Sequence, residues 1–191
     1  EEGGIRKLAG FPGNVTDTAA YGVSGDGKRV VGSAFAGSNV QMGFLWEDGK
    51  SVQLFTDLLP VANPNHTLAL YTANSDGTVI GGQIGYDVDG TGDVLFEAFV
   101  ARQVDVGAWD MNLLVAPSDQ DPTGAAMAMN SDGTIVVGYT GYKGAFSWSP
   151  KGGMLSISPM RELTTYALSE DGSLVAGGGA DPGLAFLWDP T

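Results

Sequence analysis

The sequence predicts an all-β fold built from four copies of one strand–turn–strand unit. An Asp-Gly pair recurs at 26–27, 76–77, 132–133 and 171–172, and short apolar or β-branched runs flank each pair. Thirty glycines and nine prolines among 191 residues, with 16% charged residues, are typical of a folded and turn-rich chain. The length suits a single domain, which is what we expect.

Each Asp-Gly pair belongs to a longer repeated pattern. Ser or Asn lies two residues before the Asp, and Gly lies six residues after it. Asp-Gly between apolar runs indicates a β-hairpin, because the glycine adopts positive φ and the polar side chains accept turn amides. The last glycine of the pattern predicts a close approach of backbone from a neighbouring repeat. The four copies span 21–32, 71–82, 127–138 and 166–177.

A second element follows each hairpin after a gap of variable length. It carries a Phe and, in three copies, a Trp two residues later, whereas Ala101 replaces the Trp in the second copy. Side chains two apart point to the same side of a strand, so each pair offers an apolar patch to the next repeat. Core packing is the favoured interpretation, and ligand binding is the alternative. The copies lie at 43–46, 98–101, 145–148 and 185–188.

A polar turn and a fourth strand follow the aromatic strand, at 52–54 and at 155–157. Four strands per repeat predict a four-bladed β-propeller, with a β-sandwich as the competing fold. The fourth repeat ends without such a strand, and Ile5–Leu8 reads like the missing piece. The N-terminal strand is therefore expected to pair in the last blade and close the ring, which would hide the sheet edges. The predicted blades are 19–59, 68–113, 125–158, and 164–191 together with 1–9.

Charge and composition exclude several classes of function. Nine Lys and Arg against 22 Asp and Glu give a formal charge of -13, which repels phosphate backbones and anionic lipid, so nucleic acid is not an expected partner. No apolar run approaches the roughly 18 residues of a membrane helix, so membrane insertion is not expected either. The absence of cysteine excludes disulfides and thiolate chemistry. A closed ring without free edges is expected to be a monomer.

The repeated units resemble a known family. Ala-x-x-(Ser/Asn)-x-Asp-Gly-x-x-(Val/Ile)-x-Gly and (Ala/Gly)-Phe-x-Trp are similar to the HAF extracellular repeats, and Met111–Leu114 is similar to a spacer between such repeats. The resemblance covers nearly the whole chain, and Ala101 departs from it. It implies a bacterial protein that is secreted or at the cell surface. It supplies no catalytic residues.

The long irregular segments are expected on one face of the propeller, opposite the Asp-Gly turns. Loops on a rigid scaffold often carry function, so ligand-binding residues are sought there. Tyrosines in these loops could stack on a sugar or a peptide, or cover the rim of the core. A single histidine cannot supply a His-based metal set, and a plain loop residue is the favoured interpretation of it. The ligand-binding candidates are Tyr86, Tyr139, Tyr142 and His66.

One of these segments, Tyr86–Asp93, resembles a calcium loop. Asp87, Asp89 and Asp93 are interspersed with glycines, and hard cations require several oxygen ligands on a chain that can wrap around them. Thr91 stands where a third acid is usual, and Ala98 takes the position of the final Glu. A plain acidic loop is the alternative.

These observations favour a secreted or cell-surface binding module whose ligand is a protein or a glycan, held by the irregular loops. Enzyme activity is the less favoured interpretation. The alternative function is a glycan hydrolase or lyase that uses paired carboxylates near the central channel. Its candidate carboxylates are Asp87, Asp93, Asp119 and Asp121.

Overall fold

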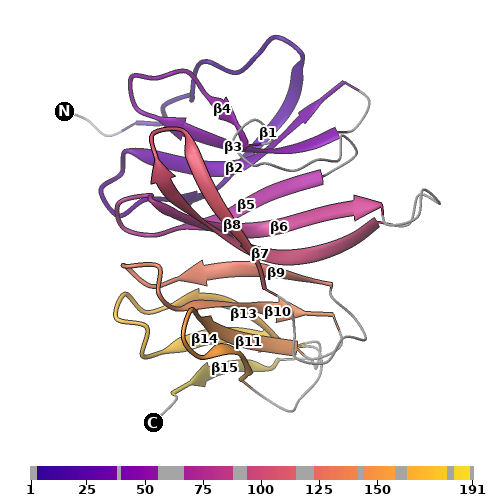
Figure 1. The fold of residues 1–191 in the computed structure, drawn as a ribbon, viewed down its shortest axis with the longest axis vertical. Helices are drawn as coiled ribbons and strands as arrows, with labels where there is room; N and C mark the ends of the chain where they lie inside the picture. The colour runs from indigo at the N-terminus through magenta and orange to yellow at the C-terminus, as the bar shows by residue number, and fades with distance from the viewer. Residues whose placement is uncertain are drawn as a thin grey trace.

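The structure is a computed structural model, and it describes residues 4–37, 40–55, 67–87, 94–114, 123–141, 144–157, 163–179 and 183–189. These residues form four antiparallel β-sheets (Figure 1). Within these ranges no helix is long and apolar enough to cross a membrane. The predicted all-β class is confirmed.

In every sheet the strands are paired in the order of the chain. The first sheet contains β1 (Val15–Val23), β2 (Arg29–Ala36), β3 (Val40–Glu47) and β4 (Gln53–Leu54). The second contains β5 (Thr67–Ala73), β6 (Val79–Asp87), β7 (Val94–Asp105) and β8 (Ala108–Leu113). The third contains β9 (Gly124–Met129), β10 (Val136–Thr140), β11 (Gly144–Ser149) and β12 (Gly153–Ser156). The fourth has three described strands, β13 (Leu163–Leu168), β14 (Val175–Gly179) and β15 (Ala185–Trp188).

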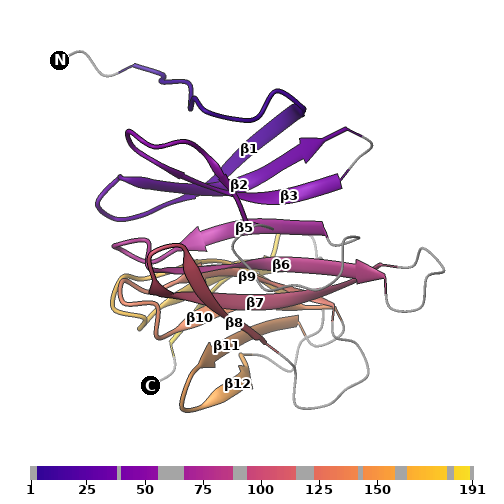
Figure 2. The ribbon, with the colours of Figure 1, turned by 45° about the horizontal axis from the view of Figure 1, so that its top comes forward.

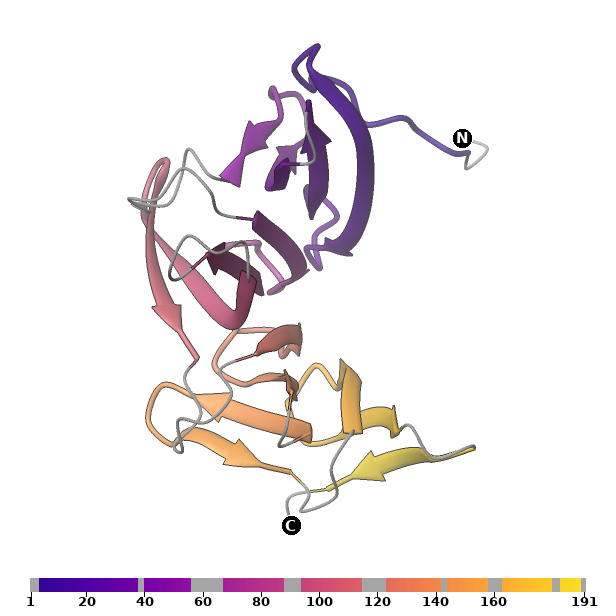
Figure 3. The same cartoon turned by 90° about the vertical axis from the view of Figure 1, so that its right-hand side faces the viewer.

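The four sheets are arranged as the blades of a β-propeller, which confirms the predicted fold (Figures 2 and 3). They follow one another along an arc, with the first and last blades at its two ends (Figure 3). The innermost strands β1, β5, β9 and β13 contact one another in sequence. Among the described residues, extensive contacts between blades join consecutive blades only.

The Asp-Gly hairpins form as the repeat predicts. The Asp26 carboxylate accepts hydrogen bonds from the Ser24 hydroxyl at 2.6 Å and the Lys28 amide at 3.0 Å. The Ser or Asn before it bridges the two strands, because Asn74 Oδ1 accepts the Val79 amide at 2.9 Å. The glycine after each Asp has a positive φ, between 67° and 78°. Each turn therefore satisfies its own backbone donors through side chains that the repeat supplies.

The last glycine of each repeat has a different cause from the one expected. A Cβ on Gly32 would collide with the Ala19 carbonyl oxygen of the paired strand and with the Phe44 ring. The same collision with the paired strand recurs at Gly82, Gly138 and Gly177. The prediction that a neighbouring blade approaches here was wrong, since the close approach lies inside each blade.

The apolar core lies mainly between blades. Val31 and Leu45 of the first blade pack with Leu70 and Phe99 of the second, and all four are buried. A second cluster joins the second and third blades, where Val100 packs with Ala126, Val136 and Phe146. Residues that face the adjacent blade thus hold the array together.

The predicted closure by the N-terminal strand is wrong. Among the described residues β15 has no outer neighbour, and the N-terminal segment (residues 4–14) lies against the first blade instead. Leu8 and Phe11 pack on the cluster that contains Phe44, and Arg6 Nη2 lies 3.2 Å from Asp48 Oδ1. The first blade offers this segment an apolar patch and a counter-charge close by, whereas the last blade lies at the far end of the arc (Figure 3). The expectation of a monomer depended on that closure.

Candidate functional site

Each innermost strand carries a β-bulge at the same position of the repeat. The register with the second strand shifts between Ala20 and Gly22, so Tyr21 is the extra residue. Equivalent shifts single out Tyr71, Met127 and Tyr166. Bulges re-aim a side chain and are common beside functional sites. The last glycine of each repeat lies opposite the bulge. The repeat pattern therefore includes both the bulged residue and the glycine that makes room for the paired strand.

The bulged tyrosines and Tyr139 of β10 line the inner strands, and we call Tyr21, Tyr71, Tyr139 and Tyr166 the inner tyrosine surface. The rings of Tyr21 and Tyr71, on adjacent blades, have centroids 5.3 Å apart and are tilted by 58°. Tyr71 donates its hydroxyl to Gln83 Oε1 at 3.3 Å. Tyr21 and Tyr166 keep 51% and 64% of their surface exposed. Rings anchored on strands and open on one face are suited to stacking.

Two phenols of this surface, those of Tyr71 and Tyr139, have raised pKa values. Burial raises the pKa of Tyr71, and the neighbouring Tyr139 and Tyr21 raise it further. Burial likewise raises the pKa of Tyr139. The Tyr139 hydroxyl thus keeps its proton and can donate a hydrogen bond to a ligand, whereas the Tyr71 proton is donated to Gln83.

A hollow of about 680 Å³, which we call the turn hollow, lies where the Asp-Gly turns of all four blades meet. Two residues after each bulge, every innermost strand places an apolar side chain in its wall. Gly25, Ser75, Ser131 and Glu170, the residues before the four Asp, supply its rim. These apolar side chains are Val23, Ala73, Met129 and Leu168.

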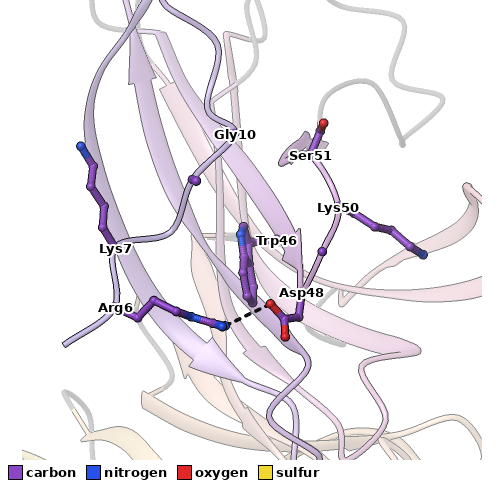
Figure 4. A pocket seen from close by; sticks show the side chains of 9 residues that line it. Arg6, Lys7, Gly10, Trp46, Asp48, Lys50 and Ser51 are labelled. Carbon is purple, nitrogen blue, oxygen red and sulfur yellow. Dashed lines mark ion pairs between the residues drawn. The ribbon is translucent and has the colours of Figure 1, made fainter. Parts of the chain in front are cut away.

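A second hollow, of about 400 Å³, lies beneath the N-terminal segment (Figure 4). The Arg6 guanidinium lies over the Trp46 ring at 5.1 Å and pairs with Asp48. Lys50 Nζ lies 2.8 Å from Glu47 Oε1. Arg6 and Lys50 are exposed and already paired with carboxylates. We therefore interpret this hollow as the place where the N-terminal segment attaches to the first blade, and not as a ligand site.

Comparison with known family models and with curated protein sequences gives no match. Among solved structures, the chain is similar to the crystal structure of TolB from Acinetobacter baumannii, with a TM-score of 0.49 and 13% sequence identity. The match covers 91% of this chain and 43% of that chain, so this chain spans less than half the length of that protein.

The structure separates the residues that the sequence grouped on the irregular loops. Tyr139 belongs to the inner tyrosine surface, whereas Tyr86 lies at the end of β6, away from the bulges. Tyr142 and His66 lie outside the described residues, as do Asp89 and Asp93 of the expected calcium loop and Asp119 and Asp121. Asp87 ends β6. Within the described ranges, no group of three His, Asp or Glu is placed to hold a metal.

One buried carboxylate was missed by sequence reasoning. Glu97 of β7 is buried, and its Oε2 makes no hydrogen bond within the described part of the chain. It lies beside Tyr86, whose pKa is raised to about 12 by burial and by the Glu97 carboxylate. Glu97 and Thr123 form an isolated bridge between the second and third blades. An incompletely satisfied buried carboxylate requires an explanation, and function is one.

Sequence reasoning also missed Tyr21, Tyr71 and Tyr166. All three stand at the first position of the repeated hairpin pattern, which predicts a structural unit and not a ligand site. The available signal was an aromatic residue at one fixed position in three of the four copies. That position becomes informative only when the bulge shows that its side chain leaves the regular alternation of the strand.

Proposed function

We propose that the chain is a binding module that holds an extended protein segment or glycan chain along the inner tyrosine surface. The observation that carries the proposal is the bulge that presents an aromatic side chain from three innermost strands. This location replaces the irregular loops as the centre of the ligand site. Tyr139 is common to both interpretations.

The chemistry of the surface favours a neutral or basic ligand. Aromatic faces stack on sugar rings and on apolar side chains, and phenol hydroxyls add directional hydrogen bonds. The formal charge of -13 repels a polyanion. The turn hollow, two residues further along the same strands, extends the contact for a longer ligand.

The test compares Tyr21→Ala and Tyr166→Ala with the unaltered protein in glycan-array and peptide-array binding. Loss of a stacked ring is expected to weaken binding about tenfold, as for an aromatic contact of about 1–1.5 kcal/mol. Val106→Ala is the control, because Val106 is exposed on the outer turn between β7 and β8. Binding that both tyrosine variants leave unchanged, and Tyr86→Ala abolishes, would return the site to the irregular loops.

A calcium site in Tyr86–Asp93 remains a prediction. Asp87→Asn should remove a calcium-dependent rise in melting temperature if the loop binds the ion. A melting temperature that is identical with calcium and with chelator contradicts the prediction.

Glu97 is the residue that favours a second candidate function. In this function the chain is a glycan hydrolase or lyase, and the Glu97 carboxyl group acts as the acid or the base. Its buried position and its unbonded oxygen are the observations in favour. Turnover on a polysaccharide panel that disappears in Glu97→Gln, with the fold intact by circular dichroism, would establish it. Absence of turnover by the unaltered protein would contradict the enzyme function, and the binding module would be the one remaining proposal.

We also propose HAF-type repeats and a secreted or cell-surface location, on the strength of the repeat resemblance. Protease treatment of intact bacterial cells that express the full gene tests the location. Digestion that requires cell lysis would contradict it.

A further inference from the structure

The contact between consecutive blades is built in the same way three times. A side chain at the start of each second strand covers the turn glycine of the next blade. A Cβ on Gly77 would lie 2.5 Å from Arg29, and one on Gly172 would lie 2.6 Å from Ile135. Val79 covers Gly133 in the same way. Leu174 is the equivalent residue of the last blade.

A backbone hydrogen bond accompanies each of these contacts. The Asp26 amide donates to the Ser75 carbonyl at 3.1 Å, and the Ser75 amide donates to the Ser131 carbonyl at 3.0 Å. The Ser131 amide then donates to the Glu170 carbonyl at 3.0 Å. Each turn is thus joined to the next by one bond of constant direction.

The innermost strand of each following blade completes the contact. β5, β9 and β13 each lie against the first three strands of the blade before them. The core-facing residues of these strands, Leu70, Ala126 and Thr165, are fully buried. Each blade therefore contacts the following blade through its first three strands, and contacts the previous blade through its innermost strand.

Both halves of this contact are exposed at the ends of the array. On the last blade, Leu174 and Leu187 keep 39% and 68% of their surface exposed, whereas Leu45 and Val100 at the position of Leu187 are buried. On the first blade, nothing lies within 4 Å of a Cβ placed on Gly27. Ala20 of β1 is exposed where its three counterparts are fully buried.

The N-terminal segment does not occupy the docking strand. It packs on Phe44, Trp46 and Val52, which belong to the outer part of the first blade. Phe55, which follows the first blade and precedes the second, packs on Phe99 and Trp109 in the equivalent outer position. The segment thus resembles a connection between blades, and it leaves β1 free to dock.

We propose that a second copy of this chain docks head to tail, with its β1 against β13, β14 and β15 of the first copy. The three internal contacts show that these two surfaces are complementary halves of one interface. Leu174 of one copy covers Gly27 of the other, and Leu187 packs against Ala20. Two copies joined at both contacts make a ring of eight blades, which is within the range of known propellers.

The experiment measures mass by light scattering after size exclusion, at 0.15 M salt, over protein concentrations from about 1 to 200 μM, the range that spans micromolar dissociation constants. The unaltered chain is expected to form dimers. Leu187→Asp is expected to shift the dissociation constant at least tenfold, because it places a carboxylate in an apolar contact. Leu155→Asp is the matched control, since Leu155 is 64% exposed on the outer strand β12. Circular dichroism verifies that both variants are folded.

A mixing experiment tests the direction of the contact. Ala20→Glu disables the docking strand and Leu187→Asp disables the receiving face, so each variant alone is monomeric. Their mixture keeps one intact contact and is expected to form a heterodimer. An unaltered chain that stays monomeric at 200 μM, equal effects of Leu187→Asp and Leu155→Asp, or a mixture that remains monomeric would each overturn the proposal.

Discussion

A single backbone oxygen explains the glycine that ends each repeat. Gly82 lies opposite the bulge at Tyr71, and the Ala69 carbonyl occupies the place where a side chain would begin. The repeat pattern indicates that glycine is required at this position, and the expected reason was close backbone of a neighbouring blade. The structure shows instead that the close backbone belongs to the paired strand of the same blade. Spacing alone cannot separate these causes, because a bulge changes the register of a strand without changing its composition.

Gly82→Ala should therefore destabilise the fold by at least about 2 kcal/mol, because the added methyl collides with backbone that cannot yield without breaking the bulge. Gly13→Ala is the control, since Gly13 has no atom within 4 Å of the new methyl. Urea unfolding followed by tryptophan fluorescence gives both values. Equal stability of the two variants would contradict this account of the bulge.

The repeated turn aspartates predict a pH dependence at the same scale. Hydrogen bonds from the Ser169 hydroxyl, the Ser173 amide and the Ser173 hydroxyl lower the pKa of Asp171 to about 2. The pKa values of Asp26, Asp76 and Asp132 are also lowered, mainly by hydroxyl donors. Because an unfolded Asp has a pKa of about 3.9, the folded state binds these protons more weakly. The stabilisation is present above about pH 4 and is lost as the pH falls toward 2.

Asp171→Asn isolates one of these groups. The difference in unfolding free energy between the unaltered chain and the variant should be greatest at pH 5 and should shrink steadily toward pH 2. Urea titrations at pH 5, 3.5 and 2.5 measure it. A difference that stays constant over this range would show that the carboxylate acts through shape and not through its charge.

At the scale of the element, the hairpins and their order could be predicted, whereas the place of the N-terminal segment could not. Asp-Gly turns with flanking strands are local, so composition and spacing are sufficient. Ile5–Leu8 carries a short apolar pattern that suits any exposed blade edge. Leu8 and Phe11 pack on the cluster of the first blade that contains Phe44, and Arg6 contacts Asp48 and Trp46, which lie about forty residues away in the sequence.

Removal of residues 1–11 should consequently affect the first blade. The edge-to-face contact of Phe11 with Phe44, with centroids 5.1 Å apart, is lost together with the cover from Leu8. The expected cost is about 2–4 kcal/mol for two apolar side chains. Hydrogen exchange should show faster exchange in β3 and β4 and no change in β15. Faster exchange confined to β14 and β15 would support closure by the N-terminal strand.

At the scale of the whole molecule, the number of blades and their order follow from the repeat, but closure is a property that no repeat encodes. The fourth copy carries the same Asp-Gly turn and aromatic strand as the others, yet Leu187 is exposed where Leu45 and Val100 of the first two blades are buried. Whether the last blade meets the first depends on the angle between neighbouring blades, which the spacing of the repeat does not specify. The candidate site shows the same limit, since Tyr21, Tyr71 and Tyr139 come from three different blades and lie close together only in the assembled arc.

An array in which each blade contacts its neighbours should be unequally stable along its length. The second blade is covered on both sides, by the first blade and by the third, and contributes Leu70, Ile80 and Phe99 to the core. The fourth blade is covered on one side and lacks an outer neighbour for β15 among the described residues. Below the concentration at which copies associate, native-state hydrogen exchange should give the slowest exchange in β6 and β7 and the fastest strand exchange in β14 and β15. Uniform protection in all four blades would mean that the molecule unfolds as one unit and would contradict the open arc.

If association is then induced at high concentration, protection should rise first in β14 and β15, because these strands contact the docking strand of the second copy.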